Sequence, residues 1–520
     1  MISHLINYKT ARLFLLTPLF FLFSVYYSFA QKHLEGSPKT YLDPASIDLT
    51  KPTIFAIPYS HLDDQWRWSY PQVAREFIKN TLDDNFEYFE EYPNFNFNWT
   101  GAFRYQMMKE YYPEKYKELK EWVADGRWYP AGTSWTENVV NVPSTESVIR
   151  QILMGSQFFK KEFGTESREY MLPDCFGFGY ALPSVLSHCG VNGFSTQKLT
   201  WESANGIPFN IGKWIGPDGN YVIAALNAGN YAGAHEDVYS NDEKTIKRLK
   251  ENEAVSGLPI DFFYFGGGDK NNADRGGAPR KVNLETIEKS IKTDGPVKLI
   301  VAQPDLMFNA ITEEQADKFP TWNSDLLLVK HSTGVLTSQA YQKKINRDAE
   351  ILADASEKAA VTAHLLNGAA YPYEALNSGW GLFLSNQFHD ILPGTCIPEA
   401  HSFGWNDGII AINKFDGVYK DAIGTIAQTL NTNVPGVPVL VYNQLSFPRK
   451  DNVEAFIPEA LTNATSIAVF NAKGKEVPSQ IVVGFDGKRR MLFQADLPAI
   501  GAAVFSVREA KTKIKSTKRK

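Results

Sequence analysis

The 520-residue sequence predicts a mixed α/β protein in which a β/α-barrel-like domain is followed by a small helical bundle and the start of an all-β, sandwich-like region. Three observations predict this fold class. Short apolar runs alternate with helical patterns up to about residue 325, as in a mainly parallel sheet covered by helices. Helical patterns then dominate, which indicates a bundle. From residue 434 short strand-like runs are separated by turn signals, which favours a β domain.

The first predicted domain spans residues 45–328 and opens with a short apolar, β-rich run at 53–57, a strand pattern. We expect long helices over 104–122 and 147–163. Further strands are expected at 170–172, 221–226, 261–265 and 297–301.

The helical bundle is expected over residues 330–432, with helices at 338–366, 375–388 and 403–430. A partial β domain is expected over 434–508. Its predicted strands are 439–442, 453–457, 466–470, 480–483, 490–495 and 502–507. Residues 509–520 end in KTKIKSTKRK, a run typical of a solvated basic tail.

The N-terminus resembles a targeting segment. Lys9 and Arg12 precede the apolar stretch 13–30, which ends in Ser28-Phe29-Ala30, the small-x-small pattern of a cleavage site. We therefore expect residues 1–30 to be a signal peptide and the protein to be exported, to a periplasmic or extracellular location. The alternative is an uncleaved anchor, since the stretch approaches the length that spans a bilayer.

Composition excludes several classes of protein. The net charge of −5 and the sequence pI of about 6.1 argue against a nucleic-acid binder. Three cysteines in a chain of this length do not make a disulfide scaffold. None has CxxC spacing, which argues against a thiolate zinc site.

His61 and Asp63 directly follow the first predicted strand. Residues two apart on an extended backbone point to the same side, so an imidazole and a carboxylate are directed together at the strand's carboxyl end. This pair suits a divalent metal. On its own the pair is a weak signal, because most such pairs are only hydrogen-bonded turns.

Three later segments also carry candidate groups. Asp174 lies where a strand breaks into a Gly-rich loop, as either a pocket carboxylate or a turn residue. His389 ends a helical pattern, where it could cap the helix, or bind a metal beside a substrate-binding Asp390. The Gly-rich segment with Asp269 and Asp274 could approach a ligand or be a solvated loop, and it lacks the Gly-Lys-Ser/Thr ending of a phosphate loop.

In this order the segments resemble glycoside hydrolase family 38 α-mannosidases, particularly the bacterial and cytosolic branch, over about residues 52–450. The motifs that carry the resemblance are His61-x-Asp63-x-x-Trp66, Gly126-Arg127-Trp128 through Trp135 and Glu137, Leu172-Pro173-Asp174, Thr196-Gln197-Lys198-Leu199, Asn386 to Gly394 and Tyr442-Asn443.

The resemblance implies a retaining α-mannosidase that hydrolyses terminal α-linked mannose from glycans or oligosaccharides through a covalent glycosyl-Asp intermediate. It implies one divalent metal, normally Zn²⁺, that binds hydroxyls of the sugar. The positions that match the family's metal ligands are His61, Asp63, Asp174 and His389. The position of Asp174 also matches the nucleophile. Trp66 and Asp390 match residues that pack on the sugar and hydrogen-bond it.

The resemblance leaves two candidates for the acid/base. The front of the family's Gly-x-Gly-Asp motif matches Asp269, whereas the spacing to Pro279 favours Asp274, with an insertion between them. A further departure is Val139, at a position where the family usually has an acidic residue.

Members of the family usually continue for several hundred residues of β domains, so this chain is expected to be a C-terminally shortened form. The alternative function is therefore an inactive or incomplete mannosidase fragment that binds metal and glycan, or that needs a partner chain supplying the missing β domains. A third alternative is another metal hydrolase such as a carbohydrate deacetylase, against which the segment 386–394 argues.

Overall fold

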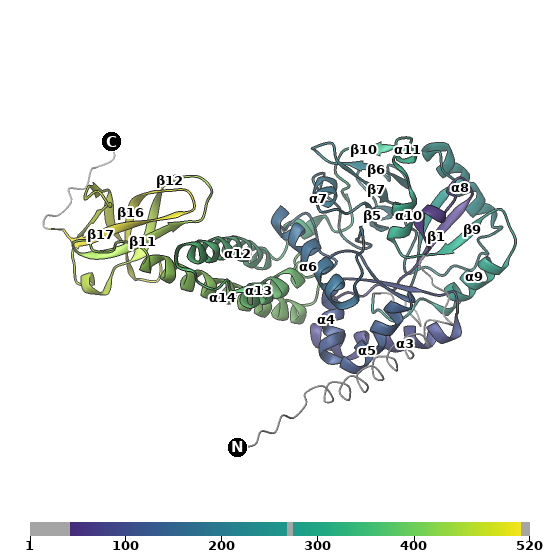
Figure 1. Cartoon of the computed structure of the whole chain (residues 1–520), viewed down its shortest axis with the longest axis horizontal. Coiled ribbons are helices and arrows are strands. Elements are labelled where there is room, and N and C mark those ends of the chain that lie inside the picture. The colour runs from purple at the N-terminus through teal and green to yellow at the C-terminus, as the bar shows by residue number, and fades with distance from the viewer. Residues whose placement is uncertain (1–41, 268–273, 511–520) are drawn as a thin grey trace, which may run out of the picture. The chain divides into compact units, whose positions relative to one another are not determined.

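The computed structural model describes residues 42–267 and 274–510, which form two compact units (Figure 1). Unit 1 comprises the described residues up to Gln339 together with Gln387–His401. Unit 2 comprises Ala340–Asn386 and the described residues from Ser402 on. The predicted signal peptide, Asp269 and most of the predicted basic tail lie outside the described residues.

In unit 1, strand β1 (Thr53–Pro58) lies at the centre of a three-stranded parallel sheet between β8 (Ile260–Phe265) and β9 (Lys298–Val301). Every residue of β1 is buried, which explains why its sequence is an apolar run and not an alternating one. Helices α8 (Glu243–Ser256) and α9 (Lys281–Lys292) pack beside this sheet (Figure 1).

The second sheet of unit 1 has the strand order β10-β6-β7-β5-β4. Strands β4 (Glu169–Met171), β5 (Gly193–Ser195) and β7 (Tyr221–Ala225) are parallel, whereas β6 (Ile211–Ile215) is antiparallel to β7. The remaining strands are β10 (Thr321–Trp322) and the parallel pair β2 (Phe97–Thr100) and β3 (Trp128–Ala131). The predicted mixed α/β fold with mainly parallel strands is confirmed, with the strands divided among three sheets.

The helices of unit 1 include α3 (Ile78–Glu91) and α6 (Thr145–Phe163), which the Ser144 hydroxyl caps by accepting a hydrogen bond from the Ser147 amide. The helical pattern expected over 104–122 is present, but it is divided into α4 (Ala102–Tyr111) and α5 (Pro113–Ala124). Proline has no amide hydrogen and disfavours a helical conformation in the preceding residue, so the helix breaks at Tyr112, which has φ −133° and ψ 56°.

The shorter helical segments of unit 1 are η1 (Pro44–Ser46), α2 (Tyr70–Gln72), η2 (Val73–Phe77), α7 (Leu182–His188), η3 (Lys198–Thr200), α10 (Asp305–Ala310), α11 (Glu313–Ala316) and η5 (Thr333–Leu336).

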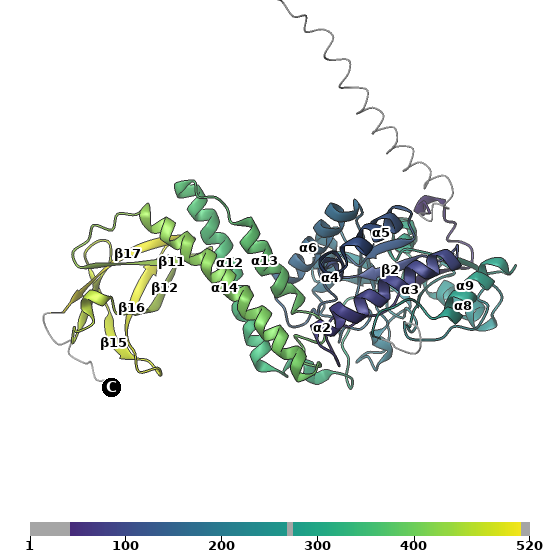
Figure 2. The same cartoon turned by 90° about the horizontal axis from the view of Figure 1, so that it is seen from below.

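In unit 2, helices α12 (Ala340–Asn367), α13 (Tyr373–Ser385) and α14 (Pro398–Gln428) lie side by side (Figures 1 and 2). Their contacts include the Trp380 indole, which donates to Glu357 Oε1 at 2.8 Å, and the Ser356 hydroxyl, which donates to the Phe415 carbonyl at 2.7 Å. The predicted helices are thus present. Although α12 and α14 have 28 and 31 residues, none of the helices among the described residues is both long and apolar enough to cross a bilayer.

Unit 2 ends in two antiparallel sheets, which are formed by β11 (Val437–Asn443), β17 (Gly501–Glu509), β13 (Ile467–Phe470) and β14 (Glu476–Val477), and by β12 (Arg449–Phe456), β16 (Arg489–Leu497) and β15 (Ser479–Val483). A short helical turn, η6 (Glu459–Leu461), precedes β13. Val469 and Val507 of one sheet share a core with Met491 and Phe493 of the other, as in a sandwich. All six expected strands are present, and β14 is additional.

Candidate active site

The candidate residues converge where strands of unit 1 end. His61 and Asp63 follow β1, Asp174 follows β4 and Asp274 follows β8. His389 comes from Gln387–His401, whose backbone pairs antiparallel with the loop after β3, with the Val139 amide donating to the Gln387 carbonyl at 2.9 Å. Carboxyl ends of parallel strands are where α/β folds commonly place their chemistry.

The structure brings together all four residues predicted to bind the metal. His61 Nε2 lies 3.0 Å from Asp63 Oδ1, and His389 Nε2 lies 3.4 Å from the same oxygen and 3.9 Å from Asp174 Oδ2. Ligand atoms of His61, Asp174 and His389 lie within 4.8 Å of one another. The same limit holds for His61, Asp63 and Asp274, and for Asp63, His389 and Asp390.

The hydrogen bonds of His389 test whether this cluster fits a cation. Its Nδ1 lies 3.0 Å from the Glu137 carbonyl oxygen, which can only accept, so Nδ1 carries a hydrogen. Nε2 is buried and has no hydrogen-bond partner among the residues that the structure describes. In a neutral imidazole this nitrogen would present a lone pair to three carboxylates. Imidazole nitrogens and carboxylate oxygens gathered this closely are a donor set that fits a divalent metal such as Zn²⁺.

The pKa shifts of the two histidines indicate that the carboxylates give the cluster an excess of negative charge. Burial by itself lowers the pKa of His61, but the carboxylates of Glu137 and Asp63 outweigh burial and raise it to about 9. The pKa of His389 is raised well above its ordinary value although burial opposes the shift, and that of Asp63 is lowered because both imidazoles outweigh burial. Without a metal, the cluster therefore draws protons onto its imidazoles.

Asp174 is held by a lysine from the next strand's loop. Lys198 follows β5, and its ammonium donates to Asp174 Oδ1 at 2.6 Å. The Lys198 nitrogen also lies 5.1 Å from the ring centroid of Phe176 and 4.3 Å from that of Trp201. The side chain of Asp174 is 15% exposed, against 4% for Asp63 and 0% for both histidines. Of the four predicted ligands, Asp174 has the most exposed side chain.

Asp274 lies beside the cluster in a backbone conformation with φ 73°. Its carbonyl accepts from the Asp63 amide at 3.0 Å, and its Oδ1 accepts from the Tyr231 hydroxyl at 3.0 Å. Burial and, next, the Asp63 carboxylate raise the pKa of Asp274 to about 6. Asp269, the other acid/base candidate, lies outside the described residues.

The two predicted substrate-binding residues, Trp66 and Asp390, each lie close in sequence to a predicted metal ligand. Asp390 is buried, accepts a hydrogen bond from the Thr395 hydroxyl and has its Oδ2 3.7 Å from His389 Nε2. Burial and, next, the Asp63 charge raise the pKa of Asp390 to about 8. Trp66 is half-buried in the loop after Asp63, where Arg67 lies 4.0 Å from its ring centroid.

Several groups of the site were not predicted to have a role. Glu137 and Lys198 lie within motifs that carry the family resemblance, so a signal for them existed. No sequence signal pointed to Arg104, which contacts both Asp64 and Glu137, or to Tyr231, which contacts Asp274. A single Arg or Tyr in a helix or loop has no recognisable spacing. Val139 is fully buried and serves the site through its backbone.

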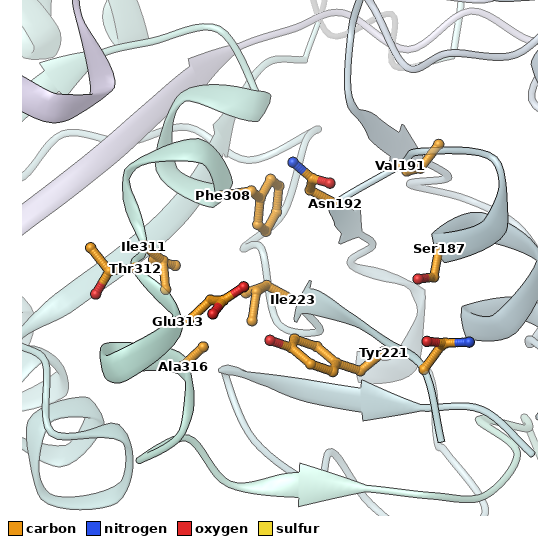
Figure 3. A pocket seen from close by; sticks show the side chains of 11 residues that line it. Ser187, Val191, Asn192, Tyr221, Ile223, Phe308, Ile311, Thr312, Glu313 and Ala316 are labelled. Carbon is orange, nitrogen blue, oxygen red and sulfur yellow. The ribbon is translucent and has the colours of Figure 1, made fainter. Parts of the chain in front are cut away.

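A surface pocket of about 320 Å³ lies elsewhere in unit 1 (Figure 3). It is lined by Val191 and Asn192, which precede β5, by Tyr221, which begins β7, and by Phe308 and Glu313, among others. Of the described residues that line it, none is a predicted site residue. Because it adjoins the amino ends of β5 and β7, whereas the candidate site residues follow the carboxyl ends of β1, β4 and β8, this pocket is not the candidate active site.

Comparison with known proteins assigns this geometry to a family. The model of the glycosyl hydrolases family 38 N-terminal domain matches residues 51–325, and that of the alpha mannosidase middle domain matches 331–425. Alpha-mannosidase 2C1 of Homo sapiens is 32% identical over 66% of this chain, and alpha-mannosidase G of Dictyostelium discoideum is 31% identical over 83%. The chain spans 32% and 38% of the lengths of these two relatives.

A crystal structure of an alpha-mannosidase from Enterococcus faecalis V583 covers 90% of this chain with a TM-score of 0.69 and 18% identity, and 57% of that chain is covered in turn. This likeness shows the fold. The first family model alone matches more than half of the chain. The protein therefore belongs to glycosyl hydrolase family 38.

Proposed function

We propose that the protein is a metal-dependent retaining α-mannosidase that removes terminal α-linked mannose from glycans or oligosaccharides. One observation carries the proposal: a solvent-reachable carboxylate, Asp174, lies in a buried cluster of two imidazoles and further carboxylates. Membership in family 38 and relatives named alpha-mannosidase support the choice of substrate.

In the proposed first step, a carboxylate oxygen of Asp174 attacks the anomeric carbon and forms a covalent glycosyl-Asp ester as the glycosidic bond breaks. Asp274 donates its proton to the departing oxygen. Its pKa of about 6 suits this role, since a general acid must be protonated near the working pH. In the second step Asp274 takes a proton from water as the water oxygen attacks the anomeric carbon, the ester bond to Asp174 breaks, and mannose is released with net retention.

The residues that would hold the metal are His61, Asp63, Asp174 and His389. When bound, the divalent metal, Zn²⁺ in this proposal, would bind the hydroxyls of the sugar and help distort its ring. Lys198 would hold one oxygen of Asp174 in place through its hydrogen bond. We assign Asp390 to a hydrogen bond with the sugar and Trp66 to packing on its apolar face.

The test is hydrolysis of an aryl α-mannoside by the purified protein, with an aryl β-mannoside as the substrate control. Activity should vanish with chelator, return with Zn²⁺ and be absent in Asp174→Asn. The matched control is Asp218→Asn, since Asp218 is an exposed carboxylate that hydrogen-bonds Ser184 and His188 away from the cluster. A 5-fluoro mannosyl fluoride should label the peptide that contains Asp174.

A folded, zinc-loaded protein that binds mannosides without hydrolysing them would contradict the proposal. It would favour the incomplete fragment, and recovery of activity on adding a chain of β domains would identify the partner. A label on another carboxylate would refute the nucleophile assignment.

We also propose that the protein is exported, on the basis of the apolar stretch at residues 13–30. N-terminal sequencing of the protein recovered from the host's envelope or medium should then begin at Gln31. Recovery of the uncut chain from the membrane fraction would favour the anchor instead.

A further inference from the structure

A fully buried carboxylate, Glu137, lies beneath the cluster and is not one of the predicted ligands. Its Oε1 accepts hydrogen bonds from the Tyr59 hydroxyl at 2.7 Å, from Arg104 Nη1 at 2.9 Å and from the Thr100 hydroxyl. Its Oε2 lies 3.3 Å from His61 Nδ1, and both side chains are 0% exposed. A buried charge is costly unless it is paired, so this arrangement holds the carboxylate firmly in place.

These contacts determine which nitrogen of His61 carries the hydrogen. The Tyr59 hydroxyl has one hydrogen, which it donates to Glu137, yet its oxygen also lies 2.7 Å from His61 Nδ1. Toward the imidazole this oxygen can therefore only accept, as can the Glu137 carboxylate. Nδ1 must be the donor, which leaves the lone pair of the neutral ring on Nε2, the atom that lies 3.0 Å from Asp63 Oδ1.

The main chain of the same residue acts on the second imidazole. The Glu137 carbonyl lies 3.0 Å from His389 Nδ1 and accepts from the His389 backbone amide at 3.2 Å. The antiparallel bridge between Asn138 and Phe388 keeps the two segments in this register. His389 is thus also restricted to the tautomer whose Nε2 lone pair is directed into the cluster.

We infer that Glu137 is a positioning residue for the metal, because its side chain orients His61 and its carbonyl orients His389, so that both rings present Nε2 to the same point. The inference rests on the metal site of the proposed function. Groups that fix the tautomer and angle of ligating imidazoles commonly change metal affinity by about 10- to 100-fold when they are altered.

The test measures zinc affinity of the full chain by competition with a chromophoric chelator at fixed pH. Glu137→Gln should bind Zn²⁺ about 10- to 100-fold more weakly than the wild type. The absorption bands of bound Co²⁺ should also shift, because His61 is less firmly oriented. Glu169→Gln is the matched control, since Glu169 is also fully buried but is hydrogen-bonded by the Gly132 amide and the Ser167 hydroxyl. It should bind zinc as the wild type does.

Removing the Glu137 charge deprives buried Arg104 of one partner, so thermal unfolding of the metal-free variants is measured beside the affinity. If Glu137→Gln does not fold, Tyr59→Phe tests the inference in its place. This variant keeps the ion pair of Glu137 with Arg104 but removes one acceptor of the His61 Nδ1 hydrogen. It should weaken zinc binding in the same direction by a smaller factor.

A wild-type protein that binds no zinc would overturn the proposed metal site, and this inference with it. A wild-type protein that binds zinc, with Glu137→Gln and Tyr59→Phe of equal affinity and unchanged Co²⁺ bands, would overturn the inference alone. Glu137 would then only stabilise the fold.

Discussion

Replacing Lys198 with methionine is expected to slow hydrolysis by about 10- to 150-fold. At an effective dielectric constant of about 20, an ammonium 2.6 Å from a carboxylate contributes about 6 kcal/mol of Coulomb attraction, most of which desolvation offsets. The net contribution of a hydrogen bond to a charged group, which is lost when the bond is deleted, is about 1.5–3 kcal/mol. If that part orients Asp174 for attack in the transition state, it corresponds to the stated loss in kcat/KM.

The assay is the zinc-saturated hydrolysis of an aryl α-mannoside at constant pH. Methionine preserves packing against Phe176 and Trp201, so the loss should come from the missing charge. Lys213→Met is the matched control, because Lys213 lies 3.0 Å from Asp317 and 4.9 Å from the Tyr221 ring centroid, outside the cluster. Wild-type kcat/KM in Lys198→Met, or an equal loss in the control, would refute the reasoning.

Three further predictions concern the acid, the metal and a buried carboxyl. Asp274→Asn should lose about 10²- to 10⁴-fold with sugar leaving groups but little with dinitrophenyl mannoside, whose leaving group needs no proton; if Asp269→Asn shows this pattern instead, Asp269 is the acid. Zinc at 100 times its Kd should stabilise unit 1 by about 2.7 kcal/mol and raise its Tm, with no shift in His389→Ala. Burial and, next, Asp305 raise the pKa of Glu169 to about 8. The folded protein therefore holds a proton that the unfolded chain releases above about pH 4.5, and stability falls by up to about 1.4 kcal/mol per pH unit toward pH 8. The Tm advantage of Glu169→Gln over the wild type should widen from pH 5 to 8, and a constant difference would contradict the shift.

Much of the fold follows from local patterns. β1 and β8 have six mainly apolar residues each, and both were predicted within one residue at each end. β2, β3 and β5 have three or four residues each, too few for a periodicity to stand out from their surroundings. The break at Tyr112 was missed because the apolar pattern continues across Pro113 even though the backbone hydrogen bonds do not.

The candidate site was predictable as a list of residues but not as a network. His61, Asp63, Asp174 and His389 could be named because each lies in a recognisable segment. The tautomers of the two histidines depend on Glu137, which is 76 residues beyond His61 and 252 residues before His389, so no local pattern reports them. The choice between Asp269 and Asp274 was likewise open, because the segment that joins them is an insertion relative to the family motif.

Unit 1 is formed from two separate stretches of the chain, and the second is synthesised only after the first part of unit 2. The chain leaves unit 1 after Gln339, forms α12 and α13, and returns only at Gln387–His401 to deliver His389 and Asp390. A ribosome must therefore translate both helices before the last imidazole exists, and the nascent cluster until then holds carboxylates with a single histidine. A product that ends at Gln339 would retain all described strands of unit 1 yet lack the segment that carries His389 and Asp390.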